Sequence, residues 1–247
     1  MKIIDCSPLR REDGSMGLTD RFRGIWRYGY SWYKDLNADQ SLLVHLQKHL
    51  GSNAVVVRSV HLASIGLPIP LILVSLAGVH VIYPSALEGI FRVKNTTWAV
   101  MDARKRRYRV SRPNPVARTK MMRDATAAYL AEMGYPVDKV FPVLYFSHPG
   151  IHVDSENPAV RIVRPDAVER FITDLLNSES LLEESQVASL ADVLSKAPPE
   201  DSSAGKSRSI AIGRLSLLSW QWLAVGLIIL LEVCILITFA VVISLNA

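Results

Sequence analysis

The sequence is poor in cysteine, with only Cys6 and Cys234 among its 247 residues. Small secreted domains that depend on disulfides carry many more cysteines than this. One thiol lies near the N-terminus and the other in an apolar segment, so we predict no disulfide between them. This usage agrees with a reducing cytoplasm.

Short motifs that would identify a known enzyme class are also missing. The chain has no G-x-x-x-x-G-K-[ST], G-x-S-x-G, C-x-x-C or H-E-x-x-H. His45 and His49 have a spacing that places two ligands on one helical face, but no third ligand lies nearby in the sequence. We therefore predict neither a metal site nor a cofactor.

Residues of the charged types are almost absent from 215–247, where Glu232 stands alone among Asp, Glu, Lys and Arg. Within this segment residues 223–245 are predominantly apolar, and as a helix they would extend about 34 Å. That length crosses a hydrocarbon core of about 30 Å. Trp220 and Trp222 precede it, where an interfacial aromatic belt is expected. We predict a transmembrane tail anchor over 215–247.

Basic residues flank this apolar segment on its N-terminal side, at Lys206, Arg208 and Arg214. The positive-inside rule then predicts a single-pass protein of the cell membrane, with its body in the cytoplasm and its C-terminus across the membrane. Inserting a charged Glu232 would cost about 2.5–3.5 kcal/mol. Glu232 is either a tolerated neutral acid or an intramembrane contact with a partner protein's helix.

A second apolar stretch, residues 65–83, does not have the character of a membrane span. Two prolines open it, Ala77 and Gly78 interrupt it, and β-branched residues are common in it. We predict two buried strands here, 71–76 and 79–83, joined by a tight turn.

The remaining body alternates between helical and strand-like patterns. Asn114 is suited to cap a helix over 115–133, with proline at its first position. The other predicted helices are 39–50, 166–176 and 180–194, and the other predicted strands are 54–60, 89–93, 98–102, 108–110, 140–146 and 160–163. This order predicts an α/β (α+β) fold with a mixed central β-sheet flanked by helices.

The order and spacing of the central elements resemble the nuclease-related domain, NERD, a family grouped with the restriction-endonuclease-like fold. The most specific pieces are G-V-x-V-I at 78–82, Trp98, and N-P-V at 114–116. The resemblance implies a restriction-endonuclease-like domain over 38–177. Around it we predict a basic and aromatic arm over 1–37, an appended helix over 178–194, a flexible basic linker over 195–214, and the anchor.

The resemblance also implies an active site with an Asp on one strand and E-x-K on the next. The two carboxylates would hold a divalent cation that activates water. Where the family has the Asp, the Glu, the Lys and a following Gln, this sequence has Pro70, Tyr83, Ser85 and Arg118. The acid expected near the start of the first helix falls at Asp39. We therefore predict a catalytically degenerate domain without catalytic residues.

Other placements of the motif do not restore it. A register over 89–95 keeps Lys94, but Arg92 stands where the Glu should be. Glu88 and Asp102 are acids elsewhere in the sequence that could replace the missing carboxylates of the motif if the active site had moved. Neither register provides two convergent carboxylates, so metal-dependent phosphodiester cleavage is not supported.

Residues 104–123 contain nine Lys and Arg and no acid. The anion-binding candidates among them are Arg104, Lys105, Arg106, Arg107, Arg109 and Arg112. Residues 22–33 add six of the 19 aromatic residues, interleaved with arginine. Basic grooves with stacking rings bind single-stranded nucleic acid, and basic clusters near a bilayer attract anionic lipid. A solvated hairpin turn and a packed aromatic arm are the structural alternatives.

These features favour a membrane-anchored cytoplasmic interaction or scaffold protein, an accessory subunit of a membrane complex, with membrane lipid and a membrane protein as partners. A nucleic-acid-binding protein, or a residual nuclease tethered to the membrane, remains the alternative.

Overall fold

The structure is a computed structural model, and the description covers residues 1–7, 17, 30–51, 54–102, 104–135 and 137–197. The chain divides into two units, Met1–Arg208 and Ser209–Ala247, and the described residues all lie in the first. The predicted anchor, Glu232 and most of the predicted linker lie outside the described residues. Within the described part, no helix is long and apolar enough to cross a membrane.

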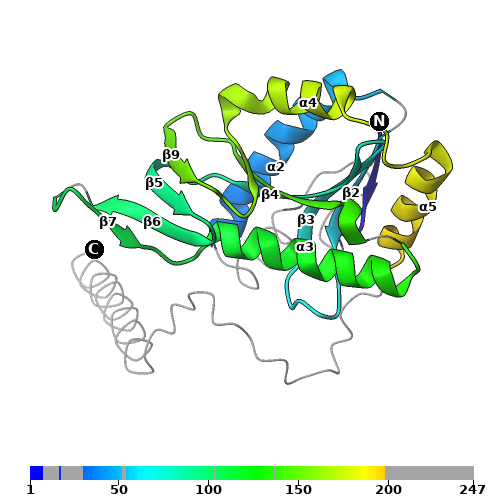
Figure 1. The fold of residues 1–247 in the computed structure, drawn as a ribbon, viewed down its shortest axis with the longest axis horizontal. Coiled ribbons are helices and arrows are strands. Elements are labelled where there is room, and N and C mark those ends of the chain that lie inside the picture. The colour runs from blue at the N-terminus through cyan, green and yellow to red at the C-terminus, as the bar shows by residue number, and fades with distance from the viewer. Residues whose placement is uncertain (8–16, 18–29, 52–53, 103, 136, 198–247) are drawn as a thin grey trace, which may run out of the picture. The chain divides into compact units, whose positions relative to one another are not determined.

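The body is a mixed α/β structure with two mixed β-sheets flanked by helices (Figure 1). The first sheet has the order β1 (Lys2–Asp5), β2 (Val55–Val60), β3 (Ile69–Ser75), β4 (Gly78–Ser85), β8 (Val140–Phe146) and β10 (Arg161–Val163). The second has the order β7 (Arg107–Val110), β6 (Thr97–Asp102), β5 (Gly89–Lys94) and β9 (Ile151–Glu156). The helices are α2 (Tyr30–His49), α3 (Pro115–Glu132), α4 (Val168–Asn177) and α5 (Glu184–Ser195), with short 3-10 turns at Val137–Lys139 and Pro165–Ala167.

The apolar stretch 65–83 forms the middle of the first sheet, as predicted. β3 and β4 pair antiparallel, with Leu71 opposite Ile82, and every residue of β4 is buried. Gly78 starts β4 with a φ of 109°, and a Cβ there would lie 2.9 Å from the Lys139 carbonyl oxygen. The tight turn between the strands therefore requires glycine at this position.

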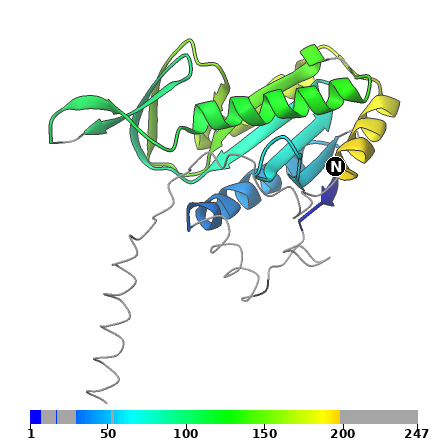
Figure 2. The ribbon, with the colours of Figure 1, turned by 90° about the horizontal axis from the view of Figure 1, so that it is seen from below.

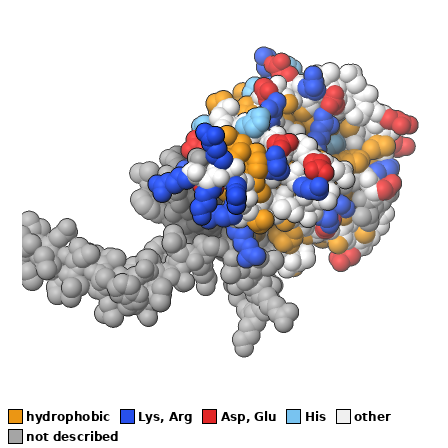
Figure 3. Space-filling model, turned by 60° about the vertical axis from the view of Figure 1, so that its left-hand side comes forward, with side chains coloured by type: hydrophobic (Ala, Val, Ile, Leu, Met, Phe, Trp, Pro, Cys, Tyr) orange, Lys and Arg blue, Asp and Glu red, His pale blue; other side chains and the backbone are white. Residues whose placement is uncertain are grey.

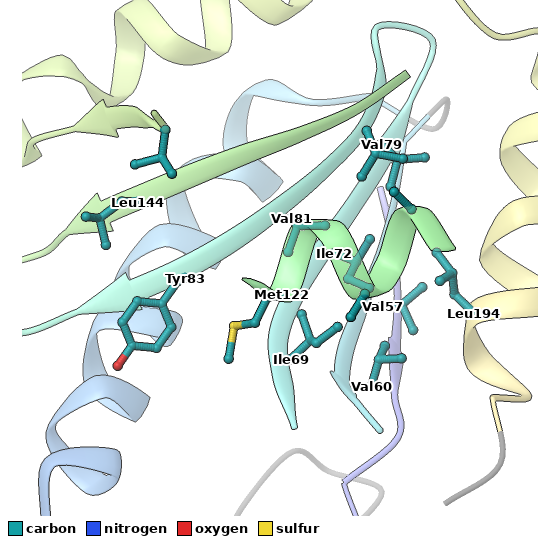
Figure 4. Close-up of a cluster of buried hydrophobic side chains, with 14 of the residues drawn as sticks. Val57, Val60, Ile69, Ile72, Val79, Val81, Tyr83, Met122, Leu144 and Leu194 are labelled. Carbon is teal, nitrogen blue, oxygen red and sulfur yellow. The ribbon is translucent and has the colours of Figure 1, made fainter. Parts of the chain in front are cut away.

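Helices cover both faces of the six-stranded sheet (Figure 2). One apolar cluster joins α2 and α4 to one face, and a second joins α3 and α5 to the other. Figure 4 shows Met122 of α3 and Leu194 of α5 on the same side as Val57 and Ile72. Burial on both faces explains why β3 and β4 have continuous apolar sequences rather than alternating ones.

Several elements differ from the sequence predictions. The first helix begins at Tyr30 instead of residue 39, and β1 pairs in parallel with β2. The predicted arm over 1–37 therefore contains a strand and the first eight of the 20 residues of α2. The last helix begins at Glu184 instead of residue 180. Strand β9 was not predicted, and β5, β6, β7 and β9 form a second sheet instead of extending one central sheet. Parallel pairings such as β1 with β2 and β5 with β9 join distant parts of the chain, and local patterns carry no record of them.

The start of α3 is as predicted. Asn114 Oδ1 accepts a hydrogen bond from the Ala117 N–H at 3.0 Å, and Pro115 is the first helical residue. The Asn114 side-chain amide also donates to the Thr96 carbonyl at 2.8 Å. The cap therefore attaches α3 to the turn between β5 and β6.

Candidate functional site

Three side chains from three elements meet near the carboxyl end of β4, and we refer to Asp35, Tyr83 and Arg118 as the Tyr83 cluster. The Tyr83 hydroxyl donates to Asp35 Oδ2 at 2.9 Å, and the Ala86 N–H donates to Asp35 Oδ1 at 3.1 Å. Arg118 Nη1 donates to the Tyr83 hydroxyl oxygen at 3.1 Å, and its guanidinium carbon lies 4.8 Å from the ring centroid. These contacts connect α2, β4 and α3.

Burial dominates the electrostatics of this cluster. It raises the pKa of Asp35, while hydrogen bonds from Ala86 and Tyr83 and the charge of Arg118 act in the opposite direction. Burial also raises the pKa of Tyr83 far above its ordinary value, despite the nearby Arg118. Tyr83 therefore remains a protonated donor at neutral pH.

The structure brings together two of the four positions singled out by the family motif, Tyr83 and Arg118. Ser85 is buried at the end of β4, where its hydroxyl accepts from the Leu87 N–H at 3.4 Å. Pro70 is half-buried in β3. Within the described residues, no hydrogen bond or ion pair connects Ser85 or Pro70 to the Tyr83 cluster.

The acid in the cluster is Asp35, and Asp39, where the resemblance places the acid expected near the start of the first helix, lies one helical turn further on. The Asp39 carboxylate instead pairs with buried Arg58 of β2, which also lies 3.5 Å from Asp5 of β1. Asp35 was not among the predicted site residues because the helix was expected to begin at residue 39, which left Asp35 in the arm. The spacing of Asp35 and Asp39, one helical turn apart, was the available signal.

The alternative catalytic positions have other contacts. Arg92 and Lys94 lie in the second sheet, where they form exposed ion pairs with Asp154 at 2.8 Å and Glu156 at 2.9 Å. Asp102 Oδ1 accepts the backbone N–H groups that follow it in the β6–β7 turn. Glu88 lies 3.3 Å from His148. Glu88 and Asp102 thus belong to separate local contacts.

No group of three or more His, Cys, Asp or Glu side chains in the described part of the chain is arranged to hold a metal ion. His45 and His49 lie near the end of α2, and His49 is exposed. The contacts within the Tyr83 cluster are hydrogen bonds and the contact of the Arg118 guanidinium with the Tyr83 ring.

Most cations of the anion-binding segment lie on a hairpin formed by β6, β7 and their turn; we call residues 97–112 the basic hairpin. Its six candidate side chains are all exposed: Arg104, Lys105, Arg106, Arg107, Arg109 and Arg112. None of the six forms an ion pair with an acid among the described residues. Figure 3 shows Lys and Arg side chains gathered on the side of the molecule that carries this hairpin.

An open groove of about 560 Å³ lies between β4, β8, β10 and the end of α4. His80 borders it and is 7% exposed, with Nδ1 lacking a hydrogen-bond partner in the described structure. Burial, together with the charge of Arg161, lowers the pKa of His80 to about 4, so this imidazole is neutral at pH 7. Neither His80 nor this groove was among the predicted site residues.

We compared the chain with protein-family models, with curated proteins and with solved structures, and found no match in any of the three. The resemblance to the nuclease-related family therefore remains a prediction from the sequence.

Proposed function

We propose that this protein is a membrane-anchored interaction protein, whose body is a restriction-endonuclease-like domain of the nuclease-related type that has lost its catalytic site. The Tyr83 cluster is the observation that supports this proposal. At the position of the motif's Glu it has a buried tyrosine, and the only carboxylate in the cluster is already satisfied by Tyr83 and a backbone N–H.

The charge of the cluster supports the same conclusion. A hard divalent cation requires several oxygen ligands, usually including carboxylates. Arg118 contributes a positive charge to the Tyr83 hydroxyl from 3.1 Å, and this charge opposes cation binding at the same place. The residues of the cluster thus do not fit the metal that the family's chemistry needs.

A nuclease assay tests the loss of catalysis. The purified full chain in mild detergent is incubated with single-stranded DNA, duplex DNA and RNA in the presence of Mg²⁺ or Mn²⁺. We expect no cleavage above the buffer background. Cleavage that disappears in Glu88→Gln or Asp102→Asn would contradict the proposal and indicate migrated catalytic carboxylates.

The interaction role is tested at Glu232, which lies in the predicted span. A photo-crosslinking residue in place of Leu236, one helical turn from Glu232 and on the same face of the predicted helix, should capture a membrane protein. Glu232→Leu should release that protein during purification in detergent. Cys234→Ala is the matched control, because two residues turn a helix by about 200° and place position 234 on another face. Equal loss in both variants would argue against a specific contact at Glu232.

A further inference from the structure

The basic hairpin carries uncompensated positive charge on a defined framework. Arg92 and Lys94 of the same sheet have acidic partners, whereas the six hairpin cations have none within the described residues. Asp102 Oδ1 accepts the N–H groups of Arg104 at 3.0 Å and Lys105 at 3.2 Å. The backbone that carries these two side chains is therefore positioned before any ligand arrives, which lowers part of the entropic cost of binding.

The shape of the hairpin suits a flat polyanion. β6 and β7 project from the body beyond β5 and β9 (Figures 1 and 2). Arg104, Lys105 and Arg106 occupy the turn, and side-chain alternation places Arg107 and Arg109 on one face of β7. Because the hairpin projects from the body, these cations can contact a planar charged surface at the same time.

The aromatic residues of the hairpin favour lipid over single-stranded nucleic acid. Binding of single strands without sequence preference depends on free aromatic faces on which bases stack. The hairpin contains two aromatic residues, Trp98 and Tyr108. Trp98 is 1% exposed, and the Arg92 guanidinium lies over the Tyr108 ring at 4.1 Å. Phospholipid headgroups require only charge and hydrogen-bond donors.

We propose that the basic hairpin docks onto an anionic bilayer surface, with its arginine and lysine side chains among the phospholipid headgroups. Arginine suits this role because its planar fork donates paired hydrogen bonds to phosphate. The docking rests on the proposed function, since a membrane anchor keeps the body close to the bilayer. Each basic residue near an anionic surface adds about fivefold to the association.

The test measures the height of the hairpin above the bilayer. The full chain, with Cys6→Ser, Cys234→Ala and Val110→Cys, carries a donor fluorophore at 110, a position 67% exposed. It is reconstituted into phosphatidylcholine vesicles with or without about 30% phosphatidylserine and an acceptor-labelled lipid. We expect stronger energy transfer in the anionic vesicles. The difference should disappear at 0.5 M salt, because the Debye length there is only about 4 Å and the attraction between hairpin and headgroups is screened.

Two variants distinguish the effect of the hairpin cations from the effect of the total charge of the protein. Arg104→Gln, Lys105→Gln and Arg106→Gln together should lower the ratio of docked to undocked hairpin roughly 100-fold and abolish the lipid dependence. The control replaces Lys94, Arg164 and Lys196 by Gln, which removes the same charge from exposed ion-paired residues elsewhere. The control should keep the response of the unsubstituted hairpin.

Three outcomes would overturn the docking proposal. The first is equal energy transfer in neutral and anionic vesicles. The second is an equal loss of the response to lipid charge in the control variant. The third is submicromolar binding of a 20-base-pair DNA duplex that depends on the hairpin, with no response of the energy transfer to lipid charge. Resistance of the chain to alkaline extraction from neutral vesicles reports the anchor separately. Release of the chain from neutral vesicles by alkali would contradict the membrane anchor of the proposed function. The energy-transfer measurement would still test the docking of the hairpin.

Discussion

At the scale of single residues, the Tyr83 hydroxyl connects a carboxylate from the helix on one side of the sheet with a guanidinium from the helix on the other side. It donates to Asp35 and accepts from Arg118, so both charged groups depend on it. Loss of this hydroxyl leaves buried polar atoms with fewer partners, which costs more than the hydrogen bonds themselves contribute.

Tyr83→Phe should therefore lower the free energy of unfolding by about 1–3 kcal/mol. Tyr145→Phe is the matched control, because within the described part of the chain its buried side chain has a single hydroxyl contact, with Ser41 at 3.4 Å. Urea unfolding of the full chain in mild detergent, followed by tryptophan fluorescence, measures both. A Tyr83→Phe loss no larger than the control loss would show that the cluster contributes nothing to stability.

His80 makes stability depend on pH. Its pKa falls from 6.5 to about 4 on folding, so the unfolded chain binds more protons between these values. Stability from this site is complete above about pH 6.5 and is lost progressively down to about pH 4, by about 3 kcal/mol at most. Replacement of His80 by Phe should remove this part of the pH dependence.

The measurement compares urea unfolding at pH 7, 5.5 and 4.5 for the native sequence and His80→Phe. His49→Gln, which changes an exposed histidine at the end of α2, should keep the native pH dependence. Parallel curves for the native sequence and His80→Phe would contradict the assignment of a neutral buried imidazole.

At the scale of elements, α3 is positioned by its cap as well as by its apolar face. Asn114 accepts from the first turn of the helix and donates to the β5–β6 turn. Asn114→Ala should lower the free energy of unfolding by about 1–2 kcal/mol, while Asn114→Asp keeps the cap acceptor and should cost less. Thermal unfolding of the three chains measures the order, and equal losses for Ala and Asp would exclude a capping role.

At the scale of the whole molecule, Arg58 joins the N-terminal strand to the first helix. It is buried between Asp5 of β1 and Asp39 of α2. Arg58→Met removes a buried cation from beside these two carboxylates and should cost about 3–5 kcal/mol. Urea unfolding measures this loss, and Arg164→Met, which breaks an exposed pair with Asp166, should cost under about 1 kcal/mol.

A second substitution distinguishes lost charge balance from lost packing at Arg58. Arg58→Met with Asp39→Leu removes both charges of the closest pair and should recover part of the stability lost by Arg58→Met. No recovery would mean that Arg58 acts through its packing or through Asp5 alone.

Local sequence patterns were sufficient to predict the elements that are specified by residues close together in the chain. The β3–β4 hairpin follows from prolines, a glycine and β-branched residues within 65–83, and α3 follows from Asn114, Pro115 and Gly134. Pairings between distant segments were not predictable in this way. β9 is held by parallel pairing with β5, and its mostly exposed sequence has no strong apolar alternation of its own.

The sequence by itself determined which side chains stand where the predicted resemblance would place the nuclease motif, because Pro70, Tyr83 and Ser85 are fixed by residue identity. It also determined the excess of cations over 104–123. Only the tertiary structure decided that Asp35, and not Asp39, completes the Tyr83 cluster. That choice depends on where α2 begins and how it crosses the end of β4, and such packing is set by contacts between segments about fifty residues apart.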